Sequence, residues 1–215
     1  RASGPAPLVK LHDFIRETMH NAQGRKLTPL EAHDICNQIA EIVVVGGVRR
    51  SSQISLSDLD DQEMRHAKDW PYPIKRAMAN NSAIYREKPT AAQFLQEWGS
   101  LAQSGTGERG IFNLEAAQSK APSRRYSPKI QGTNPCGEII LSPYDSCRLM
   151  LVNLTSFVQN AWTQEAYFEW GKFANIVQKA QRLMDDMIDL EIEQIDKIIE
   201  KIKKDPEPKS VKLIE

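Results

Sequence analysis

The most informative segment of this sequence is Gly132-Thr133-Asn134-Pro135-Cys136-Gly137-Glu138-Ile139-Ile140-Leu141. Within it a cysteine lies two residues from an amide on one side and two residues from a carboxylate on the other. Pro135 and Gly137 flank the cysteine, and these residue types favour a turn over a helix or strand. Such a turn can present a thiol, an amide and a carboxylate to one small pocket. The alternative is a surface turn with an inert thiol, because most cysteines are packing residues, and spacing alone does not separate the two.

The other cysteines and the histidines give weaker signals. Cys147 follows eleven residues after Cys136, so a hairpin that returns on itself could bring the two thiols together. A buried structural cysteine is the alternative. Cys36 falls on the apolar side of a predicted helix, which predicts an inert packing residue. The four histidines are scattered without the spacing of metal ligands, so no mononuclear metal site is expected.

A second candidate region, residues 45–52, joins a predicted helix to a predicted strand. Two glycines there expose backbone amides beside two arginines, a combination that favours an anion such as phosphate. A helix end with solvated arginines is the alternative. The candidate binding residues of this region are Arg49, Arg50 and Ser51.

A third candidate region offers amide and hydroxyl groups that could bind a base edge or a ribose. It consists of Asn80, Asn81 and Ser82. A turn before a strand is the alternative interpretation, because these residue types are also common in turns.

The composition bounds the class of protein. The 215 residues are 40% hydrophobic and 26% charged, which permits a sizeable core. Lys plus Arg and Asp plus Glu both number 28, and this balance argues against a nucleic-acid-coating protein. No apolar run approaches the roughly 20 residues that cross a bilayer, and no signal peptide opens the chain. Three cysteines without a CxxC fit neither a disulfide scaffold nor a zinc ribbon. A cytoplasmic protein without a membrane partner is therefore expected.

Helical patterns alternate with short strand patterns along the chain, which predicts an α/β fold. The first clear helix has a T-x-x-E capping box formed by Thr28 and Glu31. The expected helices cover residues 28–45, 60–68, 90–102 and 163–204. The expected strands cover residues 52–57, 82–86, 139–141 and 149–152. Residues 103–110 and 119–133 are expected to form flexible or exposed loops.

These segments together resemble the large catalytic chain of ribonucleotide reductases, in particular the adenosylcobalamin-dependent (class II) type. The segments that carry the resemblance are 3–5, 46–51, 134–138, 146–149, 153–154, 182–186 and 189–191. They span nearly the whole chain in the family's order. The resemblance implies part of a ten-stranded α/β barrel, which this chain cannot close alone, with a long C-terminal helical segment. Its implied parts are a substrate and effector loop region over 28–118, the active-site cysteine loop over 119–160 and the helical segment over 163–204.

The resemblance also implies a role for each matched residue of the cysteine loop. Cys136 would become a thiyl radical that removes the ribose 3′ hydrogen, and Glu138 would take the 3′ hydroxyl proton so that water leaves from the 2′ carbon. Asn134 would hold the ribose hydroxyls. Cys147 would be one of two cysteines that supply the electrons and finish as a disulfide. The family's partner for this cysteine lies upstream of residue 1, and Cys36 does not match it.

The expected function is the conversion of ribonucleotides to 2′-deoxyribonucleotides for DNA synthesis. The implied cofactor is adenosylcobalamin, and the implied reductant is an external dithiol such as thioredoxin. The implied partners are a ribonucleotide substrate, a nucleotide effector and the remaining reductase segments, on other chains or in missing parts of the same chain; a homodimer is a further option. The chain begins without Met, as a natural or engineered fragment would. The alternatives are an inactive remnant and a non-enzymatic interaction module built on the C-terminal helix.

Overall fold

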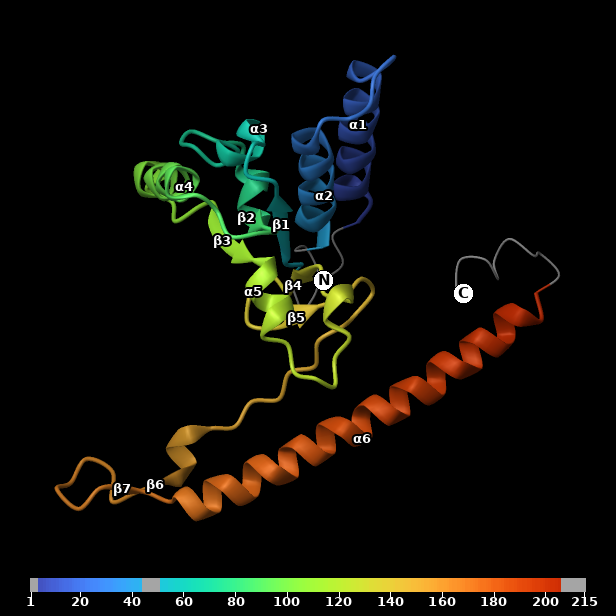
Figure 1. Cartoon of the computed structure of the whole chain (residues 1–215). Coiled ribbons are helices and arrows are strands. Elements are labelled where there is room, and N and C mark those ends of the chain that lie inside the picture. Colours follow the sequence, from blue (N-terminus) through green and yellow to red (C-terminus); the bar gives the residue numbers. More distant parts are fainter. Residues whose placement is uncertain (1–3, 44–50, 206–215) are drawn as a thin grey trace. The chain divides into compact units, whose positions relative to one another are not determined.

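The structure is a computed structural model that describes residues 4–43 and 51–205. The chain divides into two compact units, Arg1–Cys147 and Arg148–Glu215. The first unit combines helices with a parallel sheet, and the second is dominated by one long helix (Figure 1). This mixture of helices and strands confirms the α/β class.

A three-stranded parallel sheet forms the centre of the first unit. Its strands, in spatial order, are β1 (Gln53–Ser57), β2 (Ala79–Tyr85) and β3 (Gly110–Asn113). Parallel neighbours need crossover connections, which usually contain helices. The crossovers contain α3 (Gln62–Arg65), the 3₁₀ helix η1 (Ile74–Met78) and α4 (Ala91–Ser104). The central strand β2 is thereby held on both sides.

The two faces of this sheet differ in chemistry, because successive side chains of a strand point to opposite faces. On one face, called the loop face, Leu56 and Ile84 pack in a cluster with Ile130 and Ile140. Helix α5 (Leu114–Ser119) adds Leu114 to the same cluster. The opposite face, called the helix face, carries polar side chains. The core cluster of large apolar side chains therefore lies on the loop face, while the helix face also buries the smaller Ala79 and Ala83.

Two helices precede the sheet and contact each other: α1 (Ala6–Asn21) and α2 (Pro29–Val43) (Figure 1). The predicted capping box of α2 is confirmed, since Glu31 N donates to Thr28 Oγ1 at 3.2 Å and Thr28 N donates to Glu31 Oε2 at 2.9 Å. Asn37 of α2 accepts from Gln53 Nε2 at 2.5 Å, which joins this helix to the helix face. Helix α1 was not among the expected elements.

Three expectations for the chain after residue 118 are wrong. Residues 149–152 form no strand, and Leu149 and Leu151 are 69% and 92% exposed. A short apolar run fixes no partner strand, and none lies beside it here. Residues 119–133 are not exposed throughout, because Ile130 is fully buried. The long helix α6 (Trp170–Lys203) begins later than residue 163, since a short hairpin precedes it. The strands of this hairpin are β6 (Val158–Gln159) and β7 (Tyr167–Phe168).

The second unit is built around the first turn of α6. Phe157, Phe168 and Phe173 pack together there with ring centroids 5.3–5.9 Å apart, and Arg148 forms an ion pair with Glu191. The expected apolar stripe runs along α6, but its side chains are largely exposed within the described chain; Leu183 and Met187 are 56% and 52% exposed. The stripe therefore stabilises little in this unit by itself.

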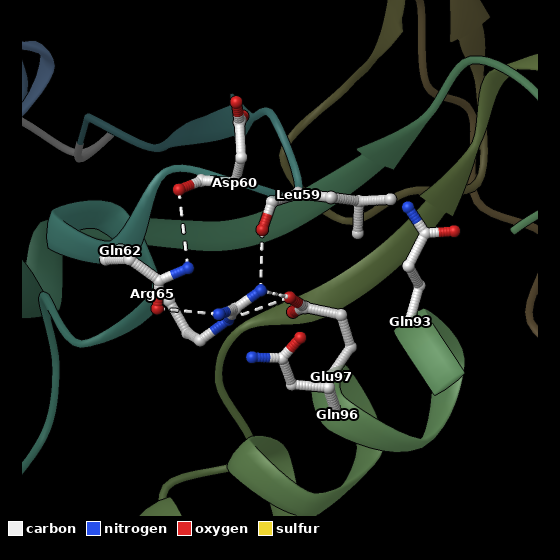
Figure 2. A pocket seen from close by; sticks show the side chains of 7 residues that line it. All are labelled: Leu59, Asp60, Gln62, Arg65, Gln93, Gln96 and Glu97. Atoms are coloured by element: carbon white, nitrogen blue, oxygen red, sulfur yellow. Dashed lines mark hydrogen bonds and ion pairs between the residues drawn. The ribbon is translucent and has the colours of Figure 1, made fainter. Parts of the chain in front are cut away.

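A buried charged cluster joins the sheet to α3 and α4. Arg65, Glu97 and Arg109 are each at most 6% exposed. Arg65 Nε donates to Glu97 Oε1 at 2.8 Å (Figure 2), and Arg109 Nε donates to Glu97 Oε2 at 3.0 Å. Burial raises the pKa of the Glu97 carboxyl, but hydrogen bonds from the two arginines outweigh burial and hold this pKa below its ordinary value. The carboxylate is therefore charged at neutral pH.

Ile130→Ala should lower the free energy of unfolding by about 2–5 kcal/mol, because it empties a fully enclosed site that the surrounding chain can fill only in part. Urea denaturation followed by circular dichroism measures this loss. The matched control is Ile74→Ala, at a side chain that is 78% exposed. Equal losses from both variants would contradict the position assigned to Ile130 in the core.

Glu97→Gln should destabilise the fold by about 3–5 kcal/mol at neutral pH, because it leaves two buried arginines without their counter-charge. The Glu97 pKa is lowered from 4.5 in the folded state. Its contribution is therefore complete above pH 4.5 and is lost as the pH falls through the lowered pKa. The stability difference between wild type and variant should shrink below pH 4.5, measured by urea denaturation at several pH values. A difference independent of pH, or an equal loss in the exposed control Glu63→Gln, would refute this assignment.

Candidate active site

The cysteine segment is a tight turn carried by two very short strands. Strands β4 (Gly132–Thr133) and β5 (Ile140–Leu141) pair antiparallel, with Gly132 opposite Leu141. Gln131 N extends this pairing by donating to Leu141 O at 3.0 Å. A Cβ at Gly132 would meet Leu56 Cδ1 at 3.5 Å, so β4 lies against the loop face of the sheet. The expected strand at residues 139–141 is thereby confirmed as a short one.

Asn134 closes the turn from within. Its backbone N–H donates to Ile139 O at 3.0 Å, and its Oδ1 accepts from Ile139 N at 3.0 Å. Its carbonyl accepts from Gly137 N at 3.0 Å. Gly137 has φ +87°, a conformation that glycine adopts without steric cost. Residues 134–139 are therefore locked to one another by three hydrogen bonds around a 5% exposed asparagine.

The reactive groups of this turn are accessible. Cys136 and Glu138 are both exposed, and neither side chain makes a hydrogen bond or ion pair within the described chain. The Oδ1 of Asn134 is occupied by the turn, and its Nδ2 amide makes no hydrogen bond to the described residues. The turn thus brings a thiol, a carboxylate and an amide donor together on five consecutive residues. Their catalytic roles stay predictions.

The third candidate region divides between the two faces of β2. Asn80 lies on the loop face, where its Nδ2 donates to Pro135 O at 2.7 Å and so contacts the cysteine turn. Ser82 lies on the same face and is half-buried beside Gly110. Asn81 points to the helix face and is 2% exposed, and neither of its side-chain polar atoms has a hydrogen-bond partner among the described residues. One ligand cannot therefore contact Asn80 and Asn81 from the same side.

The remaining candidates lie apart from this turn or outside the described residues. Arg49 and Arg50 fall outside the described residues, and Ser51 is half-buried. Cys147 is half-buried after a turn in which Asp145 Oδ2 accepts from Ser142 N at 2.9 Å. The expectation for Cys36 is wrong in one respect. Its thiol is exposed, because the side of α2 that faces inward carries His33, Asn37, Gln38 and Ala40 instead.

A cavity of about 390 Å³ lies beside the buried charged cluster (Figure 2). Its lining includes Arg65, Glu97, Gln93 and Gln96, and no residue of the cysteine turn belongs to it. No sequence pattern predicted this cluster, because Glu97 lies 32 residues from Arg65 and 12 from Arg109. Such spacings follow no local period. The cavity therefore borders the charged cluster and is separate from the active site predicted at the cysteine turn.

The described residues contain neither a candidate metal site nor a candidate membrane-spanning helix. Residues 4–43 and 51–205 contain no group of three or more His, Cys, Asp or Glu side chains able to hold a metal ion. Within the same ranges, no helix has both the length and the apolar character needed to cross a membrane.

Comparison with known proteins gives one consistent result. The family described as "Ribonucleotide reductase, barrel domain" matches residues 55–206. A protein of Lactobacillus helveticus (strain DPC 4571) named adenosylcobalamin-dependent ribonucleoside-triphosphate reductase is 32% identical over 207 residues, which cover 85% of this chain and 27% of that protein. A protein of the same name from Lactobacillus leichmannii is 29% identical over 209 residues, which cover 85% of this chain and 27% of that protein. Another, from Levilactobacillus brevis, is 32% identical over 180 residues, which cover 79% of this chain and 23% of that protein. No solved structure matches.

The chain therefore spans about a quarter of the length of these relatives. The matched range contains the cysteine turn, the parallel sheet from β1 residue 55 onward and all of α6. The two compact units are thus parts of one family domain. Because the family match covers more than half of the sequence, this chain belongs to the ribonucleotide reductase barrel-domain family.

Proposed function

We propose that this chain carries the radical cysteine and its neighbouring acid-base group in an adenosylcobalamin-dependent ribonucleotide reductase. The observation that supports this most directly is the locked turn that exposes Cys136 and Glu138 around a buried Asn134. The relatives named above act, by their names, on ribonucleoside triphosphates. We take a ribonucleoside triphosphate as the substrate for that reason.

The proposed reaction begins at the exposed thiol. Adenosylcobalamin, when bound, supplies the radical that takes the hydrogen atom from Cys136 Sγ. An accessible thiol fits this cofactor, because a hydrogen atom can be removed only where the donor is within reach. We assign no other residue of this chain to the cofactor. The Cys136 sulfur then removes the hydrogen atom from the ribose 3′ carbon.

Acid-base chemistry follows at the neighbouring carboxylate. Glu138 accepts the 3′ hydroxyl proton, which assists departure of the 2′ hydroxyl as water. Cys147 and a partner cysteine outside this chain together supply two electrons and two protons and end as a disulfide. Cys136 returns its hydrogen atom to the 3′ carbon. The net change is one ribonucleotide and one dithiol converted to one deoxyribonucleotide, water and one disulfide.

Asn134 has one hydrogen-bonding group available for substrate. Its carbonyl oxygen is used inside the turn, at 3.0 Å from Ile139 N. The Nδ2 amide can therefore donate to a ribose hydroxyl oxygen, as the family resemblance suggests. We therefore propose that the substrate lies on the exposed side of the turn, beside Cys136 and Glu138.

The proposed partners follow from the size of the chain and from the reaction. The chain spans 27% of the Lactobacillus helveticus relative, so the remaining barrel segments are needed to complete the site. They also offer cover for the exposed apolar stripe of α6. An external dithiol such as thioredoxin would reduce the disulfide after each turnover. A nucleotide effector is proposed for the region of residues 28–118.

Cys136→Ala should abolish deoxyribonucleotide formation in the complete reductase, because alanine has no hydrogen atom that can be transferred in this way. Cys36→Ala is the matched control, since Cys36 is an exposed thiol on α2. That variant should retain activity within about twofold, as is usual for surface substitutions. Product formation is measured by chromatography of the nucleotides. Comparable losses from both substitutions would reject Cys136 as the reacting thiol.

Glu138→Gln should lower kcat by about 10²–10⁴-fold, because a carboxamide cannot accept the 3′ hydroxyl proton. KM should change little if the carboxylate acts mainly in the chemical step. The control is Glu17→Gln, an exposed glutamate on α1. Steady-state kinetics of the complete reductase measure both constants. A rise in KM with an unchanged kcat would show that Glu138 binds substrate without taking part in proton transfer.

A further inference from the structure

We propose that Asn80 is a positioning residue for this reaction: its side-chain amide fixes the cysteine turn against the sheet and so sets the place of Cys136 Sγ. The contact is a hydrogen bond of 2.7 Å from Asn80 Nδ2 to Pro135 O. That carbonyl belongs to the peptide group that joins Pro135 to Cys136. The inference rests on the proposed function, because the position of the thiol matters for catalysis only if Cys136 reacts.

The cysteine turn moves as a unit unless something outside it holds it. Its internal hydrogen bonds link residues 134–139 to one another, while its strands β4 and β5 are two residues long each. Such a short ladder restrains the tilt of the turn only weakly. Within the described residues, the bond from Asn80 is the only hydrogen bond between the three-stranded sheet and residues 134–138. Apolar packing of Ile140 in the loop-face cluster holds the base of the turn, and the bond from Asn80 restrains its tip next to Cys136.

Asn80 is itself held on both sides. The paired residues of β2 and β3 begin at Ser82, so the first residues of β2 extend beyond β3. There Lys68 Nζ donates to Ala79 O, and Glu108 Oε2 accepts from Asn81 N at 2.6 Å. These two groups belong to the peptide bonds before and after Asn80. The backbone that presents the Asn80 amide is thus clamped at both neighbouring peptides.

The clamp is an ion pair between a buried lysine and a partly buried glutamate. Lys68 Nζ lies 2.9 Å from Glu108 Oε1, and the side chains are 7% and 18% exposed. A pair shielded from solvent is held more firmly than an exposed one, because water competes less for its partners. A connected series of contacts therefore runs from this ion pair through β2 and Asn80 to the peptide next to the reacting thiol. This series of contacts restrains the backbone of Cys136, whose own side chain is exposed.

The competing role for Asn80 is direct contact with the substrate, which its amide chemistry also permits. The two roles affect kinetics differently. A substrate contact contributes to binding in the ground state and raises KM when removed. A positioning contact leaves binding nearly intact and lowers kcat, because small displacements of a reacting group are costly in rate.

The kinetic test compares three substitutions in the complete reductase. Asn80→Ala removes the amide, Asn80→Asp keeps its shape but cannot donate to Pro135 O, and Asn80→Gln keeps a donor. We expect kcat to fall by about 10–100-fold in the first two variants, with KM changed less than about threefold. Asn80→Gln should recover part of the loss. Asn175→Ala, at an exposed asparagine of α6, is the matched control and should leave both constants unchanged.

A second measurement needs no turnover. The rate of Cys136 alkylation by iodoacetamide is followed by mass spectrometry in the absence of substrate and cofactor. Cleavage after Glu138 places Cys136 and Cys147 on different peptides. Asn80→Ala and Asn80→Asp should raise the Cys136 rate severalfold, because the released turn can present the already exposed thiol to the reagent in more orientations. The rate at Cys36, an exposed thiol on another element, should stay constant; an unchanged circular dichroism spectrum shows that the fold is retained.

Three results would overturn the proposal. Unchanged alkylation of Cys136 in both Asn80→Ala and Asn80→Asp would show that the bond does not hold the turn. A raised KM with unchanged kcat would assign Asn80 to substrate binding instead. Equal kinetic losses in Asn80→Gln and Asn80→Asp would show that the donor is not what matters. If the wild-type reductase makes no deoxyribonucleotide, the proposed function fails, and the alkylation rates alone then decide whether Asn80 holds the turn.

Discussion

The accessible thiol of this chain depends on the pairing of Asn134 with Ile139. Two strands of two residues each form too small a ladder to define the conformation of a loop. Asn134 compensates by using its backbone N–H, its carbonyl and its side-chain oxygen in the same turn. Because those groups are satisfied inside the turn, Cys136 and Glu138 need no contacts of their own to stay in place. Their side chains remain accessible for chemistry.

The side chains of the central strand β2 point alternately to the loop face and to the helix face, so this strand contributes to both. On the loop face it contributes Ile84 to the apolar cluster and Asn80 to the cysteine turn. On the helix face Asn81 and Tyr85 are buried, and their side-chain polar atoms lack hydrogen-bond partners within the part of the chain that the structure describes. A buried unpaired polar group costs about 1–3 kcal/mol. The apolar loop face and the Arg65–Glu97–Arg109 cluster must offset that cost.

Local features of the sequence predicted structure well, and non-local ones did not. The capping box at Thr28 specifies a helix start through contacts three residues apart and is confirmed. The helix expected from residue 90 is also confirmed, and a capping box of Thr90 and Gln93 begins it. The short helix α3 is capped by Asp61, one residue later than expected, because neighbouring aspartates look alike in a pattern. Strand β3 and helix α5 were missed, since four- and six-residue elements carry too little periodicity.

The candidate site shows the same limit. The turn chemistry of residues 134–138 is local and could be predicted from Pro135 and Gly137. The strand expected at 149–152 failed because an apolar run does not say whether another strand will lie beside it. Asn80 was a candidate for its amide, but its contact spans 55 residues. No pattern within the sequence indicates that its partner is the carbonyl of Pro135.

The radical role proposed for Cys136 requires both access to the thiol and a rigid backbone around it. Side chains are usually fixed by burial, since close packing leaves few alternative rotamers, yet a buried thiol cannot meet a substrate. This chain fixes the backbone around Cys136 and leaves the side chain exposed. The restraint comes from hydrogen bonds to Asn134 on one side and from Asn80 on the other, and Asn80 in turn is held by the shielded Lys68–Glu108 pair. Rigidity is thus supplied from a distance by a largely shielded ion pair, and the thiol proposed to react keeps its access to solvent.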